Sequence, residues 1–496
     1  MQIDIRKPAI AVTLKKNVGR ATVAGSAPLS ARYTNTARDI DLTPYLGERG
    51  AVKVTKSVRG PAGSFSIVLA DKIDLDIQDT LYALIEPMDA IEIYMAGSAY
   101  KKAPSGPPIM MRGFVSSVQR MEGMSADGKP SRMIVVSGQD YGKIMQILQI
   151  FNMPFGQDVA STITNFPFFA RFGFESRPMT AEVFIGTVFD KVVNPYLATM
   201  RENPDGTTAS TAPLLPIKAD IQSNGEQVSP FGAGGWSQGT MQGLITQFCD
   251  IGPWNEFFIE DRADAPYAVY RPNPFRDAAT GSLILPGATA PAITDITRAD
   301  VVTMTCERSD ANVGNYYWVD SPRFSIVHGS VALAVAFQSS AKGGPKTVYV
   351  DDYGNVNPAL YGTRKMEEAT QMAGPDEQYN GNGLNGSALE QSKVGLLDWI
   401  TLRREQLIAQ NRDNVVFESG SLHLKGNEAI KAGTYVRLNS GDMQHLHYAV
   451  SVTHDFAPFG NYFTTVEFER GTGFIDRTTR SAKMSSPYWA EMVRKS

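Results

Sequence analysis

Three neighbouring stretches of sequence decide the fold: Gly426-Asn-Glu-Ala-Ile-Lys-Ala-Gly-Thr-Tyr-Val-Arg-Leu438, Tyr448-Ala-Val-Ser-Val-Thr-His-Asp-Phe456 and Gly460-Asn-Tyr-Phe-Thr-Thr-Val-Glu-Phe-Glu-Arg470. Each is rich in β-branched and aromatic residues and is bounded by glycine or polar turn residues, which is typical of antiparallel strands. A further strand is expected just upstream, over 414–423. Residues 413–475 therefore predict most of a small β module.

A second set of strands lies near the start of the chain, between residues 36 and 150. Short apolar stretches recur there with regular turn residues between them, as in Ala51-Val-Lys-Val-Thr-Lys-Ser-Val58 and Arg132-Met-Ile-Val-Val-Ser137. This spacing predicts a small antiparallel barrel or sandwich. Asp140 is expected to cap a short helix that runs to Ile150.

Residues 151–299 predict an α+β domain. One helix is expected after Thr180 and ends at Asn194-Pro195, and another runs from Thr240 to Gly252-Pro253. A hairpin should follow, from Glu256 to Arg271, and residues 201–236 should form a surface loop.

The rest of the chain completes the expected domain plan. Residues 300–338 should begin the second β module, and 339–412 should be an insertion with a long helix from Ser387 to about Gln410. On that helix Leu389, Leu396, Ile400 and Leu407 form one stripe, and Arg403, Arg404 and Glu405 lie opposite. An N-terminal arm (1–35) and a C-terminal tail (476–496) flank the domains. The predicted fold class is mainly β with α+β insertions, with two small barrel-like antiparallel β modules per chain.

Composition excludes several classes of protein. The 496 residues carry a formal net charge of -4, so the chain lacks the basic surface of a protein that grips nucleic acid. The two cysteines, Cys249 and Cys306, fall in apolar-periodic segments and predict buried free thiols in a reducing cytoplasm. The N-terminus lacks a secretory signal, and the longest apolar runs are too short to span a bilayer, which predicts a soluble protein.

Few motifs point to chemistry. Gly381-Asn-Gly-Leu-Asn-Gly386 matches GxGxxG, but no strand precedes it, so a loop before a helix is expected and no cofactor is predicted. His445 and His447 share one face of a strand and are the best candidates for metal ligands. No carboxylate or cysteine lies at a ligand spacing, which favours a solvated or interface histidine pair and no metal site.

A cell-wall hydrolase would need two carboxyl groups, one as a general acid and one as a second carboxylate close to it. Glu256, Glu260 and Asp261 flank an apolar strand, where charges at the ends of a hairpin are the ordinary interpretation. No catalytic residue is predicted.

The order of these strands resembles one known family, the hub proteins of contractile-tail baseplates, which include phage late-control D proteins and the hub part of type VI secretion spikes. The resemblance is carried by the three stretches quoted first and by a second set near the start: Pro87-Met-Asp-Ala-Ile-Glu-Ile-Tyr94, Met111-Arg-Gly-Phe-Val-Ser-Ser-Val118 and Arg132-Met-Ile-Val-Val-Ser-Gly-Gln-Asp140. It covers about half of the chain, and residues 201–236 and 339–386 have no counterpart.

This resemblance implies a homotrimer in which three chains present six similar β modules around a channel for DNA. Such a ring would join the sixfold tail tube, or a tube-initiator protein, to a threefold central spike, with the tape-measure protein as a further candidate partner. The protein would belong to the virion baseplate and would assemble in the host cytoplasm. Two alternatives stay open: a tail-associated peptidoglycan hydrolase, and a carbohydrate-binding β protein.

Overall fold

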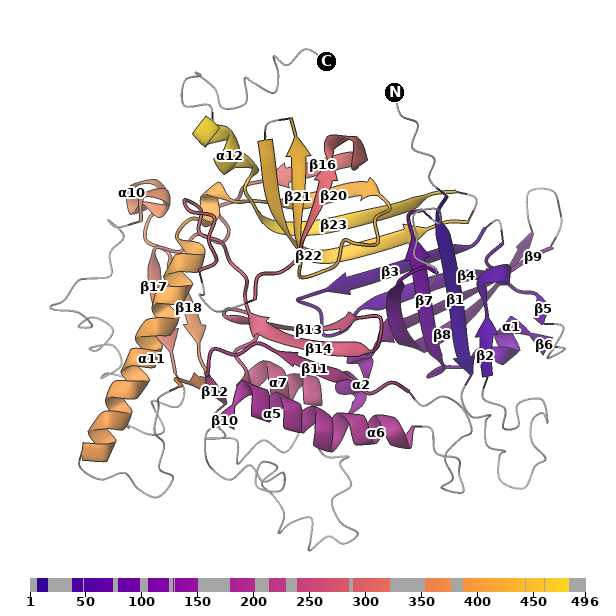
Figure 1. Cartoon of the computed structure of the whole chain (residues 1–496), viewed down its shortest axis with the longest axis horizontal. Helices are drawn as coiled ribbons and strands as arrows, with labels where there is room; N and C mark the ends of the chain where they lie inside the picture. The colour runs from indigo at the N-terminus through magenta and orange to yellow at the C-terminus, as the bar shows by residue number, and fades with distance from the viewer. Residues whose placement is uncertain are drawn as a thin grey trace, which may run out of the picture.

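The computed structural model describes residues 7–16, 38–47, 49–74, 79–98, 106–124, 128, 130–149, 179–200, 214–228, 239–284, 289–321, 353–375, 387–441, 443–458 and 460–480. Within these ranges the chain is mainly β, with antiparallel sheets and α+β segments, so the predicted fold class is confirmed. Figure 1 shows the N-terminal strands on one side, the C-terminal strands above and a group of helices below.

Thirteen strands form the main sheet. We call the N-terminal group the first module; it comprises β1 (Ala9–Lys16), β2 (Arg38–Asp41), β3 (Ala51–Ser57), β4 (Ser64–Ala70), β7 (Ala90–Ala96), β8 (Ile109–Met124) and β9 (Pro130–Asp140). The second module comprises β15 (Ile293–Thr297), β16 (Val301–Glu307), β20 (Glu418–Lys425), β21 (Tyr435–Ser440), β22 (Met443–Phe456) and β23 (Tyr462–Gly471). The strand order is β16-β20-β23-β22-β3-β4-β9-β8-β7-β1-β2, with β21 on β22 and β15 on β21.

The first module is built by alternation along its strands. In β4, Phe65, Ile67 and Leu69 are buried while the residues between them are partly or fully exposed. The expectation of an arm over residues 1–35 is wrong for Ala9–Lys16, which forms β1 between β7 and β2. Its alternating Val12 and Leu14 are fully buried, so this short apolar segment packs into the core of the module.

Gly138 in β9 lies where the sheet leaves no room for a side chain. A Cβ atom there would overlap the carbonyl oxygen of Phe114 and the ring of Phe65. We expect Gly138→Ala to lower the free energy of unfolding by about 1–3 kcal/mol, the usual range for overpacking. Gly123→Ala in β8 is the matched control, because nothing lies within 4 Å of its Cβ position. Thermal melts of both variants would check this, and equal melting temperatures would contradict it.

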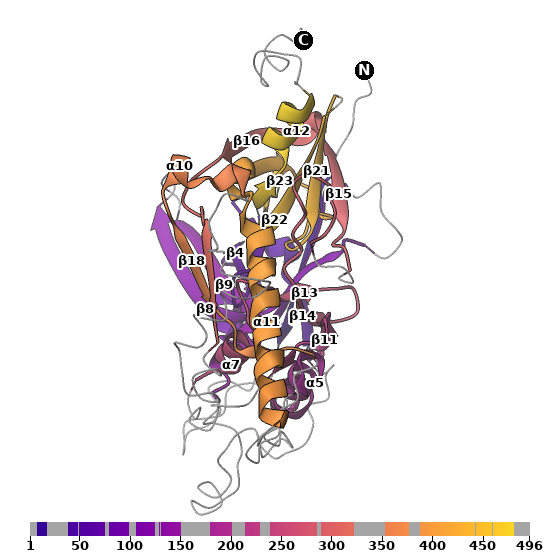
Figure 2. The ribbon, with the colours of Figure 1, turned by 90° about the vertical axis from the view of Figure 1, so that its left-hand side faces the viewer.

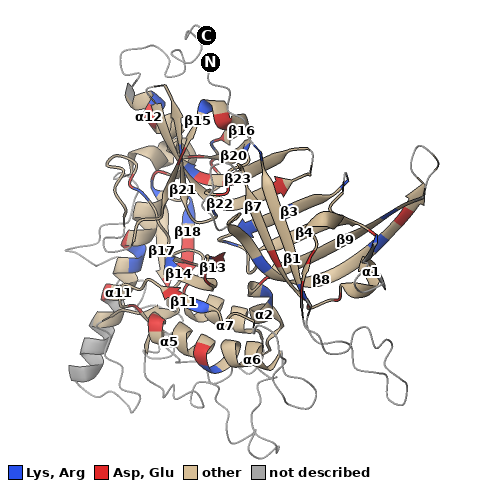
Figure 3. Ribbon diagram, turned by 45° about the vertical axis from the view of Figure 1, so that its right-hand side comes forward, with Lys and Arg blue, Asp and Glu red and all other residues tan. Residues whose placement is uncertain are grey.

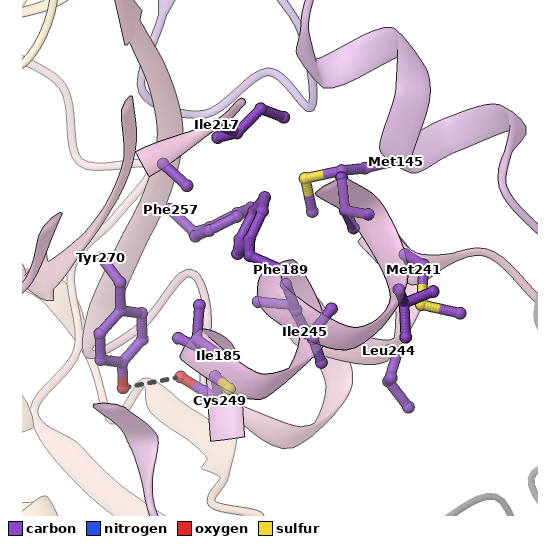
Figure 4. Close-up of a cluster of buried hydrophobic side chains, with 14 of the residues drawn as sticks. Met145, Ile185, Phe189, Ile217, Met241, Leu244, Ile245, Cys249, Phe257 and Tyr270 are labelled. Atoms are coloured by element: carbon purple, nitrogen blue, oxygen red, sulfur yellow. Dashed lines mark hydrogen bonds between the residues drawn. The ribbon is translucent and has the colours of Figure 1, made fainter. Parts of the chain in front are cut away.

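The stretch of chain that connects the first module to the second forms helices and a buried hairpin. The helices are α2 (Gly142–Ile147), α5 (Ala181–Val188), the π-helical turn η5 (Phe189–Val193), α6 (Asn194–Thr199) and α7 (Met241–Phe248); the hairpin is β13 (Asn255–Asp261) with β14 (Pro266–Pro272). The predicted threonine caps are confirmed, because Thr180 accepts a hydrogen bond from Val183 and Thr240 accepts one from Gly243. The cap predicted at Asp140 is wrong, because Tyr141 is the N-cap residue of α2. Figure 4 shows the helices packing through Ile185, Phe189 and Ile245 beneath Phe257 and Tyr270 of the hairpin.

Two expectations for this domain are wrong. The helix does not end at Asn194-Pro195, because Pro195 stands in the first turn of α6, where its missing N–H is not needed. Residues 201–236 are not all loop either: β11 (Lys218–Ile221) pairs in parallel with β14, and β12 (Gln227–Val228) joins a small sheet with β10 (Met179–Thr180) and β19 (Met372–Ala373).

The long helix α11 (Ser387–Asn411) stands beside β17 (Tyr316–Asp320) and β18 (Lys365–Ala369), as Figures 1 and 2 show. These two strands pair only with each other among the described strands, so β17 is not part of the second module as expected. Leu396, Ile400 and Leu407 are buried as predicted. Arg403 is not on an exposed face: it is buried, and its guanidinium lies 3.2 Å from Asp250 and over the ring of Trp399.

The remaining described elements are short: β5 (Ile73–Asp74), β6 (Asp79–Thr80), α1 (Leu81–Leu84), α10 (Pro358–Tyr361), α12 (Gly473–Arg480) and four 3-10 turns at Thr43–Tyr45, Arg298–Asp300, Gly354–Val356 and Asn414–Val416. Cys249 is buried as expected, but Cys306 is exposed on β16, which among the described strands pairs with β20 alone. None of the described helices is both long and apolar enough to cross a membrane.

Candidate functional site

The feature that joins the two modules is a single long strand, β22. Its first half pairs with β21, from Met443 to Tyr448, and its second half pairs with β3, from Ser451 to Phe456. Along its other edge β22 pairs with β23 from Tyr448 to Phe456, with a register shift between Ala449 and Ser451 where the neighbour changes. One strand is therefore shared, and backbone hydrogen bonds fix the modules edge to edge.

Beneath this shared strand the hairpin contributes a buried ion pair. Arg271 Nε lies 2.5 Å from Glu256 Oε1, and the hydroxyl of Tyr448 in β22 donates to Glu256 Oε2 at 2.6 Å. Arg271 Nη2 also donates to the carbonyl oxygen of Gly433 in the second module, at 2.6 Å. Burial raises the pKa of Glu256, against the opposing effect of Arg271. The pair ties the hairpin to the second module.

A second charged group ties the hairpin to the first module. Lys56 of β3 lies between two buried carboxylates, with Nζ 2.6 Å from Asp140 and 2.7 Å from Asp261. Arg112 of β8 donates to the carbonyl oxygens of Arg262 and Ala263, at 2.7 and 2.9 Å, and so holds the turn of the hairpin. Polar and charged groups of both modules thus bond the hairpin.

The three histidines of β22, His445, His447 and His454, lie in different surroundings. His445 and His447 share a face of β22 as predicted, but both are buried, so the solvated pair is wrong. His445 Nδ1 lies 3.2 Å from Asp476 in α12, whereas neither ring nitrogen of His447 has a hydrogen-bond partner among the described residues. His454 contacts Ile430, Tyr462 and Thr464 instead.

Metal binding at these histidines gains no support. Among the described residues, no group of three or more histidine, cysteine or acidic side chains is placed to hold a metal ion. Burial lowers the pKa of His447 to about 3 and that of His454 to about 4, so both rings are neutral. The glycine motif 381–386 lies outside the described residues.

The carboxylates considered for hydrolysis are held in ion pairs. Glu260 lies 2.8 Å from Arg262 and 3.1 Å from Lys431, and although burial opposes it, these cations lower its pKa. Glu256 and Asp261 are buried in the two groups described above, so they are not surface charges at the ends of a hairpin. The sequence offered one overlooked signal: Arg271 is a charge within an otherwise apolar and aromatic strand, Pro-Tyr-Ala-Val-Tyr-Arg-Pro272.

An element suited to contact with other molecules projects from the first module. Beyond Val115 the residues of β8 are exposed except Val118, which packs against the core of the first module, and Met124 at the end of the strand is 78% exposed. It pairs there only with the start of β9, and Figure 3 shows this two-stranded hairpin extending away from the body.

No family model matches the sequence, and no curated protein matches it. Among solved structures, the chain is similar to a 43 kDa tail protein of prophage MuSo2 from Shewanella oneidensis, with 11% identity, coverage of 94% of this chain and 99% of that one, and a TM-score of 0.44. It is similar to a tail protein from Neisseria meningitidis, with 12% identity, coverage of 93% and 96%, and a TM-score of 0.40. It is also similar to a component of the type VI secretion system from E. coli, with 7% identity, coverage of 86% of this chain and 75% of that one, and a TM-score of 0.34.

Proposed function

We propose that this chain is a structural hub protein in the baseplate of a contractile phage tail or a related injection machine. The observation that carries the proposal is the shared strand β22, which fixes two β modules edge to edge within one chain. Joined in this way, the two modules form one continuous sheet within each chain. The order of sequence patterns that resembles hub proteins supports the same role.

The geometry of such a unit suits an adaptor between two symmetries. Three copies in a closed ring present six modules, so one side can meet a sixfold tube or tube-initiator protein while the chain itself keeps the threefold symmetry of a central spike. A tape-measure protein is a further candidate neighbour. The ring would leave a channel for DNA, and the net charge of -4 suits a wall that does not retain DNA.

In this proposal the protein acts through surfaces and not through catalysis. The projecting β8–β9 hairpin would contact a neighbouring protein of the virion baseplate, after assembly in the host cytoplasm. Exposed strand ends and edges of this kind readily add partners through backbone hydrogen bonds.

The proposal predicts the mass and symmetry of the purified chain. Light scattering should give about 162 kDa, three times the 54.1 kDa of one chain, and negative-stain views of the same sample should show a threefold ring with six lobes and an open centre. A twofold particle, or a monomer at every concentration, would contradict it.

A second candidate function, a cell-wall hydrolase, is favoured by one observation. Glu256, with its raised pKa, lines a cleft of about 370 Å³ together with Glu469. Both carboxylates are already paired, Glu256 with Arg271 and Glu469 with Arg59. Turbidity clearing of a peptidoglycan suspension that is lost in Glu256→Gln would establish this function; the hub proposal expects no clearing from either protein.

A further inference from the structure

A polar cleft of about 480 Å³ lies where α11, the second module and the start of the hairpin meet. Its volume is within the range of about 300–1,000 Å³ that is usual for ligand sites. Residues from seven separate segments of the chain line it, among them Gln410 of α11, Arg470 of β23 and Glu368 of β18. The hub role proposed above assigns no task to this cleft.

Arg470 is held in the cleft at a conformational cost. Its backbone is left-handed, with φ of 56°, a conformation that residues other than glycine rarely adopt. The guanidinium carbon lies 3.4 Å from the centre of the Phe275 ring, and Nη1 donates to the carbonyl oxygen of Gln410 at 2.8 Å. Within the described part of the chain no carboxylate forms an ion pair with it. Burial lowers its pKa to about 9, so the guanidinium remains charged at neutral pH.

Gln410 adds a second unused donor. The side chain is only 2% exposed, and its Nε2 group has no hydrogen-bond partner among the described residues. Leaving such a group unpaired is unfavourable, so a folded chain that keeps it there gains from a ligand that accepts the bond. Arg470 has further N–H groups besides the one that bonds the Gln410 carbonyl oxygen, and together with the unpaired amide of Gln410 they fit a carboxylate.

The other charged side chains in the cleft further restrict the kind of ligand that it can bind. Glu469 and Glu418 are each paired with an arginine, at 2.5 Å with Arg59 and 3.1 Å with Arg477. Glu368 is half-buried, burial raises its pKa, and the described residues provide no cation for it. The cleft therefore offers one place for an anion and one for a cation.

From these observations we infer that the cleft binds an extended polypeptide segment of a partner protein, with a carboxylate of that segment on Arg470 and Gln410 and a basic side chain near Glu368. A polypeptide is favoured over a small anion because the cleft is large and offers places for both charges. The inference rests on the proposed function only in that a hub meets other tail proteins.

The test is selection from a random peptide library against the full-length chain, followed by titration of the selected peptides. We expect the selected peptides to contain Asp or Glu, and replacing that residue by Asn or Gln to weaken binding at least about tenfold, as for a charged hydrogen bond. Gln410→Leu and Arg470→Gln should weaken binding by a similar factor. Arg437→Gln is the matched control, since Arg437 is paired with Asp295 on the exposed side of β21.

Gln410→Leu separates binding from stability. Because the wild-type Nε2 is unpaired, this variant should melt at the same temperature as the wild type or higher while losing the peptide. Absence of any selected peptide, equal binding of the Asn or Gln analogues, or equal binding by Gln410→Leu would overturn the inference. Succinate that binds as tightly as the peptides would show a small-anion site and would overturn the polypeptide assignment.

Native mass measured on the same samples keeps this inference distinct from the hub proposal. A trimer that binds no peptide would contradict the inference that the cleft binds a peptide and would be consistent with the hub proposal. A monomer that binds acidic peptides would contradict the trimeric hub and would support peptide binding in the cleft.

Discussion

Replacing Arg271 by methionine, with Glu256 left in place, is expected to lower the free energy of unfolding by about 3–5 kcal/mol. The substitution leaves a carboxylate buried at the junction of hairpin and second module, with only the Tyr448 hydroxyl to bond it. The carbonyl oxygen of Gly433 loses its donor as well. Urea denaturation followed by tryptophan fluorescence would measure the loss.

The partner variants make this a double-mutant cycle. Glu256→Leu alone should cost a similar amount, because it leaves the guanidinium unpaired, whereas Glu256→Leu with Arg271→Met should recover most of the loss, since an apolar pair can replace a buried ion pair. Arg437→Met is the matched control and should change stability by less than about 1 kcal/mol, because its pair with Asp295 is exposed. A single Arg271→Met variant as stable as the wild type would contradict the structural role of the pair.

Strands and helix caps could be predicted because their signals are local. The alternation in Ser64–Ala70 and the threonines before α5 and α7 are visible within a few residues, and the structure confirms them. The joining of the modules could not be predicted, since it pairs Ser451 with Ser57 across almost the whole chain. No short window contains both partners of such a ladder.

The candidate site was missed for a different reason. In a sequence, a charged or polar residue is normally a sign of exposure, and this rule placed Arg403 on the outer face of its helix and Glu256 at the end of a hairpin. Both are buried because each has an ionic partner far away in the sequence, Asp250 for Arg403 and Arg271 for Glu256. His447 is buried as well, and among the described residues its ring nitrogens have no hydrogen-bond partner.

His447 should make the protein acid-sensitive. Its folded-state pKa is lowered from 6.5 to about 3, first by burial and then by the positive charges of His445 and Arg477. As the pH falls below 6.5 the unfolded chain binds a proton that the folded chain does not, so this contribution to stability is present above pH 6.5 and is lost as the pH falls towards 3. At pH 5 the loss should be about 2 kcal/mol, from 1.36 kcal/mol per pH unit.

His447→Leu isolates this effect, because the ring makes no hydrogen bond with the described residues and packs 4.3 Å from the ring of Phe468. At pH 7 the variant should be within about 1 kcal/mol of the wild type, or more stable, since it removes two buried polar atoms that lack partners. Between pH 7 and pH 5 it should lose about 2 kcal/mol less than the wild type in urea denaturation. Val466→Ala in the neighbouring strand is the control, because Val466 is equally buried and does not titrate, so its effect should be the same at both pH values. Equal acid sensitivity of His447→Leu and the wild type would mean that the buried imidazole takes up its proton within the folded protein. The conclusion that the His447 ring stays neutral when buried would then be wrong.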